Sequence, residues 1–133
     1  FSVITIFDSM LNMAEKQVHE YGLNQHLASV RAINIPVLEL LKDLNVTCKK
    51  MSALGEKIVN EDRADAILLG CMTMSFSGLD KKLEKKLGVP VLNAGRVSLK
   101  TAESLLSMEL SHSKKTYPFP AKLKIKKSSK KRA

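Results

Sequence analysis

Cys71 is the residue of this sequence that is best placed to do chemistry. It follows the apolar segment Ala64–Gly70, which has the pattern of a buried strand, and it stands on the turn that comes next. In open α/β sheets, ligands bind at this edge, beyond the carboxyl ends of the strands. The amide dipoles of a following helix would favour a thiolate there, so Cys71 is a candidate base or nucleophile. The competing interpretation is a small apolar core residue.

Gly70 bears on this choice, because it ends the strand just before the thiol. A glycine there permits a close backbone approach or a positive φ, and the sequence leaves both open. Cys48, by contrast, lies early in a helical pattern with Lys49 and Lys50 beside it, at a spacing typical of packing. The gap between the cysteines fits no zinc spacing and the histidines are scattered, so no metal site is expected.

Thr5 and Arg31 are the other candidate site residues. Thr5 lies near the carboxyl end of the first expected strand, Phe1–Phe7, so its hydroxyl could reach the same edge as Cys71. A β-branched residue that simply suits a strand is an equal alternative. Arg31 lies inside the apolar segment Ala28–Ile33, and it either protects an edge strand from pairing or is the partner of an anion.

Strand-like and helix-like patterns alternate along the chain, which predicts an α/β fold with a four-stranded parallel, flavodoxin-like sheet. The other expected strand is Val89–Asn93, where Pro90 favours an edge position. The expected helices run from Asp8 or Ser9 to Gly22, from Asn45 or Thr47 to Val59, over Leu79–Leu87 and over Val97–Leu110. A loop rich in Met and Ser is expected after Cys71, and a turn over residues 93–95.

Charge is distributed unevenly along the sequence. Residues 1–113 carry 13 Lys and Arg and 13 Asp and Glu, whereas residues 114–133 carry nine basic residues and no acidic one. The net charge of +9 therefore belongs to the tail, and it does not indicate a nucleic-acid-binding body. The run Lys122–Arg132 is interpreted as a solvated disordered end, an electrostatic contact for nucleic acid or an anionic surface, or a targeting signal.

Other bulk features narrow the class of protein. No apolar run approaches the roughly 20 residues needed to span a bilayer, so no membrane contact is expected. The two cysteines favour a reducing, cytoplasmic compartment. No phosphate-binding glycine motif is present, so nucleotide binding has no support. The sequence opens at Phe1 within a core strand and without an initiator Met, so we expect a fragment with residues missing upstream.

Two segments carry a family resemblance: Leu68–Ser75 (LLGCMTMS) and Leu83–Asn93 (LEKKLGVPVLN). Residues 1–5, 21–23, 28–40 and 111–118 support it, so the likeness covers about residues 1–118. In order and spacing these segments resemble the aspartate/glutamate/hydantoin racemase superfamily, and most of all its hydantoin and allantoin racemase branch.

The resemblance implies a cofactor-independent racemase or epimerase made of two pseudo-symmetric α/β halves. One cysteine from each half faces the substrate's α-carbon; one thiolate removes the α-proton, and the opposite thiol returns a proton to the other face. Cys71 matches the second-half cysteine, and Thr5 matches a threonine of the first strand. The amides of Met72 and Thr73 match the region that holds the substrate's carboxylate or ring carbonyl. The implied substrates are amino-acid-derived compounds such as 5-substituted hydantoins or allantoin.

The same resemblance implies how the chain is organised. Residues 1–93 would be the second half-domain, residues 94–113 a helix that packs on the missing first half, and residues 114–133 a basic, disordered tail. Cys48 is in the wrong place to replace the first-half cysteine. We therefore expect the fragment to be inactive alone, with a small-molecule substrate and the N-terminal half of the same protein as its partners. Assembly into a homo-oligomer stays open.

Two other functions stay open at this point. A decarboxylase of the same superfamily needs only one thiol, as a proton donor. A cysteine after an apolar strand in the upstream sequence would support racemisation, and glycine or another residue there would exclude it. The third alternative is a non-catalytic half-domain that serves as an interaction module, with the basic tail as its contact.

Overall fold

The computed structural model describes residues 1–120 of the chain. The lysine-rich run at residues 122–132, on which the tail prediction depends, lies outside the described residues. The chain divides into two units, of which the first is Phe1–Thr101 and the second begins at Ala102. The sheet and the expected site residues all belong to the first unit.

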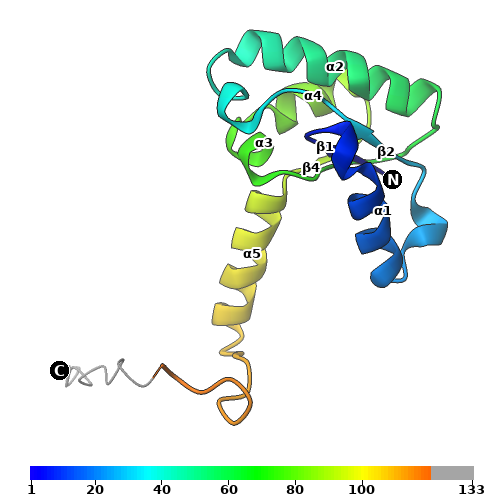
Figure 1. Ribbon diagram of the computed structural model, residues 1–133. Helices are drawn as coiled ribbons and strands as arrows, with labels where there is room; N and C mark the ends of the chain where they lie inside the picture. Colours follow the sequence, from blue (N-terminus) through cyan, green and yellow to red (C-terminus); the bar gives the residue numbers. More distant parts are fainter. Residues whose placement is uncertain (121–133) are drawn as a thin grey trace. The chain divides into compact units, whose positions relative to one another are not determined.

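The first unit contains a four-stranded sheet in which every strand pair is parallel (Figure 1). The strands are β1 (Ser2–Thr5), β2 (Ser29–Ala32), β3 (Ile67–Leu69) and β4 (Val91–Leu92). Their order is β2-β1-β3-β4, which confirms the flavodoxin-like α/β fold and puts β4 at an edge, as Pro90 indicated.

Helices follow the strands throughout the described residues. The α-helices are α1 (Leu11–Glu20), α2 (Leu44–Asn60), α3 (Met72–Phe76), α4 (Asp80–Leu87) and α5 (Ala94–Ser107). Short 3-10 turns occupy Asp8–Met10, Asn24–His26 and Val37–Glu39. Within residues 1–120, no helix combines the length and the apolar character that crossing a bilayer requires.

Alternate residues of the central strands belong to two hydrophobic clusters, one on each face of the sheet. Ile4 and Ile67 belong to the larger cluster, to which Met51 of α2 and Leu83 of α4 also contribute. Val3, next to Ile4 in β1, belongs to the smaller cluster with residues of α1. The helices α2 and α4 thus lie on one face of the sheet and α1 on the other (Figure 1).

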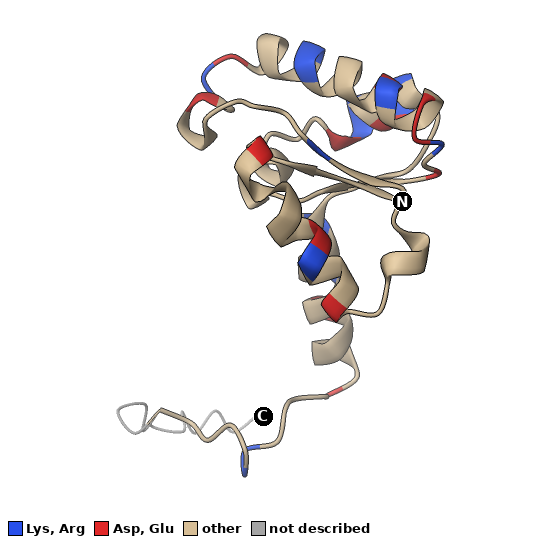
Figure 2. Cartoon of the chain, turned by 45° about the vertical axis from the view of Figure 1, so that its right-hand side comes forward, with Lys and Arg blue, Asp and Glu red and all other residues tan. Residues whose placement is uncertain are grey.

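Opposite charges are interspersed along α2 and α4 (Figure 2). Lys86 of α4 pairs with Glu56 of α2 at 2.8 Å, and Lys81 pairs with Glu84 within α4 at 3.1 Å. The neutral body that the sequence indicated therefore has part of its charge matched locally, on the outer side of the helical layer.

The starts of two helices differ from the sequence prediction. The helix α2 begins at Leu44 instead of Asn45 or Thr47, because the Asp43 carboxylate accepts hydrogen bonds from the amides of Asn45 and Val46. At α1, neither Asp8 nor Ser9 caps the helix: Asp8 opens the 3-10 turn, and α1 follows from Leu11. The cap of α2 is therefore Asp43, before both of the expected residues, and α1 has no side-chain cap.

Two predicted irregular segments are helical instead. The expected Met- and Ser-rich loop after Cys71 is the short helix α3, and the expected turn over residues 93–95 is the start of α5. At α5 the reason is the Asn93 side chain, whose Oδ1 accepts the Arg96 amide at 3.0 Å and so caps a helix that begins directly after the strand. The predicted start at Val97 was therefore late.

Arg31 joins the edge strand β2 to the segment after α2. Its guanidinium donates to both carboxylate oxygens of Asp62, with Nε and Nη2 each at 2.6 Å, and Nη2 also reaches Glu61 at 3.2 Å. Ser29 Oγ donates to the same carboxylate at 2.6 Å. Both sequence interpretations are met in part: β2 is an edge strand, and the anion that Arg31 binds belongs to the chain itself.

We predict that Asp62→Asn lowers the free energy of unfolding by about 1–2 kcal/mol at neutral pH, because an amide cannot form the bidentate ion pair. The hydrogen bonds from Arg31 hold the pKa of Asp62 below its ordinary value. A lowered folded-state pKa stabilises the fold above the unfolded-state pKa, near 4, and this contribution is lost as the pH falls through the folded-state value. Urea unfolding at a series of pH values measures the difference between wild type and variant.

The matched control is Asp65→Asn, because Asp65 is exposed and lies only three residues further along the same segment. It should change the stability by a few tenths of a kcal/mol at most. The interpretation of Arg31 fails if the two variants are equally destabilised at neutral pH, or if the effect of Asp62→Asn persists undiminished at about pH 2.

Candidate active site

The structure brings Thr5 and Cys71 to the same edge of the sheet. The strands β1 and β3 pair in parallel with Ile4 opposite Leu69, and the Gly70 amide donates to Ile4 O at 2.9 Å. Thr5 directly follows Ile4, and Cys71 directly follows Gly70. The boundary between β1 and β3 is where the strand order reverses, and in sheets of this type the crevice at that boundary is where ligands bind.

Gly70 is required at this boundary because of a close approach, which decides between the two possibilities that the sequence left open. A Cβ at residue 70 would lie 2.9 Å from Val3 Cγ1 and 3.0 Å from Ile4 O, both in β1. Gly70 is not among the glycines of positive φ. The absence of a side chain therefore lets the end of β3 lie directly against β1, immediately before Cys71.

The two cysteines have different environments. Cys48 is buried in α2, within the larger hydrophobic cluster, which agrees with the packing role expected of it. Cys71 is partly exposed, in extended backbone conformation (φ −132°, ψ 132°), and it is the residue directly before α3. Both thiols are free. Position and exposure thus make Cys71, and not Cys48, the thiol that a ligand at this edge can reach.

Backbone amides follow the thiol directly. In the first turn of α3, the amides of Met72 and Thr73 have no acceptor among residues 1–120, as is usual for the start of a helix. The Ser75 amide is the first to find one, and it donates to Cys71 O at 3.2 Å. Since α3 has only five residues, its dipole is weaker than that of a longer helix. The electrostatic contribution here comes from individual N–H groups.

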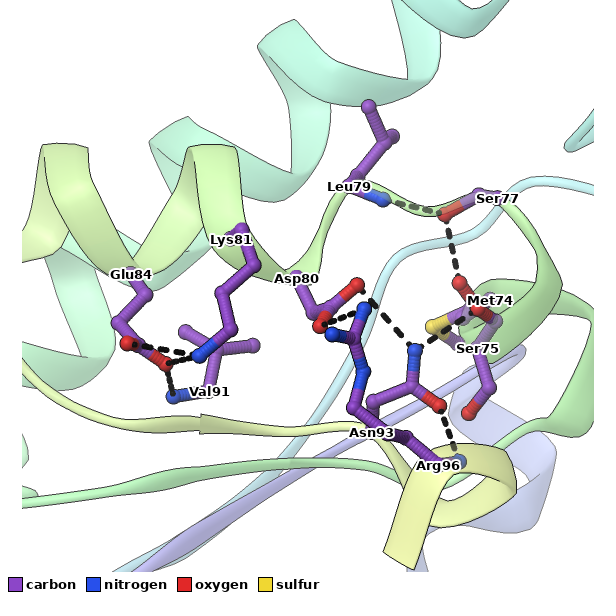
Figure 3. A network of polar contacts seen from close by, with 10 residues as sticks. All are labelled: Met74, Ser75, Ser77, Leu79, Asp80, Lys81, Glu84, Val91, Asn93 and Arg96. Carbon is purple, nitrogen blue, oxygen red and sulfur yellow. Dashed lines mark hydrogen bonds and ion pairs between the residues drawn. The ribbon is translucent and has the colours of Figure 1, made fainter. Parts of the chain in front are cut away.

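A polar network behind this turn was not identified from the sequence (Figure 3). The Asn93 amide, at the end of β4, donates through Nδ2 to Ser75 O at 2.9 Å and to Asp80 Oδ1 at 3.2 Å. Asp80 is only 1% exposed, and its other oxygen pairs with Arg96 Nη2 at 3.1 Å. The buried carboxylate is therefore matched by an amide and by a guanidinium, which offsets the cost of removing it from water.

Local signals for this network were present in the sequence. Asn93 precedes a helical pattern, as an N-cap residue does, and Asp80 stands in the first turn of the helix that the leucines predicted. Each signal is local to its own helix. The contact between the two residues depends on how β4 and α4 pack, and no pattern in the sequence reports that.

Ser75 and Gly95 lie where α3 contacts the first turn of α5. Ser75 is 5% exposed, and its hydroxyl has no hydrogen-bond partner among the described residues. A Cβ at residue 95 would lie 3.3 Å from Met72 Sδ and 3.6 Å from Ser75 Cβ. The missing side chain of Gly95 thus leaves room for the first turn of α5 beside α3.

These groups can carry out proton transfer. The edge offers one thiol, the hydroxyl of the buried residue Thr5 and the amides of the α3 start, which are groups of the kinds that move a proton or donate to a developing oxyanion. Among residues 1–120, no three side chains of His, Cys, Asp or Glu gather as a metal would require.

Known proteins resemble this chain in sequence and in fold. The sequence pattern of the Asp/Glu/hydantoin racemase family matches residues 1–102. The chain belongs to the Asp/Glu/hydantoin racemase family. It is 35% identical to the hydantoin racemase of Pseudomonas sp. (strain NS671) over 123 residues, which are 92% of this chain and 49% of that protein. It is 39% identical to the hydantoin racemase of Rhizobium meliloti over 121 residues, which are 90% of this chain and 49% of that protein.

Solved structures of racemases resemble the fold. The allantoin racemase of Pseudomonas fluorescens superposes with a TM-score of 0.76 at 37% identity, over 91% of this chain and 51% of that one. The allantoin racemase of Klebsiella pneumoniae gives a TM-score of 0.78 at 34% identity, over 86% of this chain and 46% of that one. The chain thus spans about half the length of the racemases that it matches.

We predict that Ser75→Ala leaves the free energy of unfolding unchanged or raises it, because it removes a buried hydroxyl that has no partner. The matched control is Ser2→Ala. Ser2 is fully buried and its Oγ lies 2.8 Å from Ser29 Oγ. Removing that bonded hydroxyl should cost about 1 kcal/mol. Urea unfolding measures both, and an equal loss in the two variants would show that Ser75 Oγ is not an unpaired group.

Proposed function

We propose that this chain supplies one half of the site of a cofactor-independent racemase that acts at the α-carbon of a 5-substituted hydantoin or of allantoin. The observation that carries the proposal is the place of Cys71, a partly exposed thiol at the switch point between β1 and β3, in a chain that belongs to a racemase family. Relatives named as hydantoin racemases and structures named as allantoin racemases support the class of substrate.

In the proposed reaction, the Cys71 thiolate takes the proton from the α-carbon. The electron pair of the broken C–H bond spreads onto the adjacent carbonyl, whose oxygen becomes negative. A thiol is a weak base for a carbon acid, so donors must stabilise that oxygen. The amides of Met72 and Thr73 follow the thiol directly and have no acceptor among residues 1–120, and the buried Thr5 hydroxyl ends the neighbouring strand. These three groups are the proposed donors.

A second thiol completes the reaction. It lies across the ring from Cys71 and delivers its own proton to the opposite face of the α-carbon, so that the configuration inverts. Cys71 ends the turnover as a thiol and the second cysteine as a thiolate, and the next substrate can react in the reverse sense. The length of the relatives, about twice that of the matched region, supports a second half as the source of this cysteine.

We predict that Cys71→Ser in the protein that carries both halves slows exchange of the substrate α-proton with deuterated water by roughly 100-fold or more, because an alcohol is a far weaker acid and base partner than a thiol. Loss of the α-proton signal of a 5-substituted hydantoin, followed by NMR, measures the rate. Cys48→Ser is the matched control and should leave the rate per folded molecule nearly unchanged. Undiminished exchange in Cys71→Ser would remove Cys71 from the mechanism.

We also predict that the 133-residue chain alone does not racemise a 5-substituted hydantoin above the uncatalysed rate. With one thiol, the chain has a proton donor on only one face of the α-carbon, so it cannot itself deliver a proton to the opposite face. Chiral chromatography of a single enantiomer incubated with the chain, against a buffer blank, measures this. Conversion at a rate proportional to the chain concentration would contradict the two-thiol scheme.

A further inference from the structure

We propose that Asn93 and Asp80 are positioning residues that hold the Cys71 turn in its reactive geometry. The inference deepens the proposed function and rests on it, because it assigns to two residues outside the reacting groups the task of fixing where the thiol and the donor amides stand. Neither residue touches the thiol: both act through the backbone of α3.

Both the nitrogen and the oxygen of the Asn93 side-chain amide form hydrogen bonds. Its Nδ2 donates to Ser75 O and Asp80 Oδ1, and its Oδ1 accepts from the Arg96 amide at 3.0 Å. Rotating the amide by half a turn would set Oδ1 against two acceptors and Nδ2 against a donor. One orientation of Asn93 is therefore strongly favoured, and in that orientation an N–H group points at the end of α3 (Figure 3).

That end is one helical turn from the thiol. Asn93 holds the carbonyl of Ser75, and the amide of Ser75 donates to Cys71 O at 3.2 Å. The segment needs such an anchor, because α3 has five residues and Cys71 makes no side-chain capping bond to it. A helix this short has little stability of its own. The anchor therefore decides whether Cys71, Met72 and Thr73 keep one fixed arrangement.

Within this polar network, Asp80 sets the orientation of the Asn93 side chain. It is 1% exposed, and it accepts from Asn93 through Oδ1 and from Arg96 through Oδ2. A buried acceptor oxygen at this point favours the Asn93 orientation in which the Nδ2 amide group faces it. Asp80, Asn93 and Ser75 come from three separate elements, so the network ties α4 and β4 to the thiol-bearing turn.

The test is Asn93→Asp in the full 133-residue chain. The substitution keeps an oxygen that can cap α5 and removes the N–H group that holds Ser75 O. Amide hydrogen exchange followed by NMR should show the Ser75 amide exchanging about tenfold faster relative to the core strand amides. Alkylation of Cys71 by iodoacetamide, located by peptide mass spectrometry, should change in rate while that of Cys48 stays in proportion to global unfolding.

Two control variants separate positioning from general destabilisation. Thr47→Val removes a buried hydrogen bond, from Thr47 Oγ1 to Leu40 O at 2.9 Å, in α2, which contributes no residue to the Asn93 network. It should lower the global stability without changing the relative exchange of Ser75 or the alkylation of Cys71. Asp80→Asn keeps an oxygen acceptor for Asn93 and loses the ion pair with Arg96, so it should cost stability and yet leave both local measurements near wild type.

Equal relative changes in Asn93→Asp and Thr47→Val would overturn the positioning role. A loosened turn in Asp80→Asn, as large as in Asn93→Asp, would overturn the part assigned to the Asp80 oxygen. Neither measurement depends on catalysis. The failure of the racemase proposal, seen as full activity in Cys71→Ser, is therefore distinguishable from the failure of this one, seen as an unchanged Ser75 amide in Asn93→Asp.

Discussion

The close contact of β1 with the end of β3 is the constraint on which the rest of the site depends. Gly70 donates to Ile4 O, and there is no room for a Cβ between the two strands. This contact sets Thr5 and Cys71 at adjacent strand ends, at the boundary where the strand order reverses. A larger residue at position 70 would separate the strands at the one place where the proposed chemistry needs them together.

The fold supports this contact from one side with hydrophobic packing and from the other with polar bonds. Below the site, the larger hydrophobic cluster buries Ile4 and Leu69 under α2 and α4. At the carboxyl edge, where α3 and α5 begin and backbone groups would lack partners, Asn93 and Asp80 supply hydrogen bonds instead. The larger hydrophobic cluster holds the strands in place, and the polar network holds the short segment of Cys71 and α3 that follows β3.

The agreement between sequence and structure follows the range of the interactions involved. The alternation of strands and helices was read correctly, because each element has its own apolar period. The apolar pattern places the start of α2 too late because the cap is a polar residue, Asp43, that lies before the pattern, and it shows no helix at α3 because five residues carry too little periodicity. Arg31 was recognised as unusual, but its partner Asp62 lies 31 positions away.

The sequence by itself determined the order of the strands and of the longer helices along the chain, and the position of Cys71 just after an apolar strand, because these depend on local hydrophobic patterns and on glycine. Only the tertiary structure decided that Gly70 serves a close approach, and that Asp80 and Asn93 meet behind the thiol. Those facts depend on which strands are neighbours and on how α4 packs against them. Packing of the whole chain sets such distances, and no single segment encodes them.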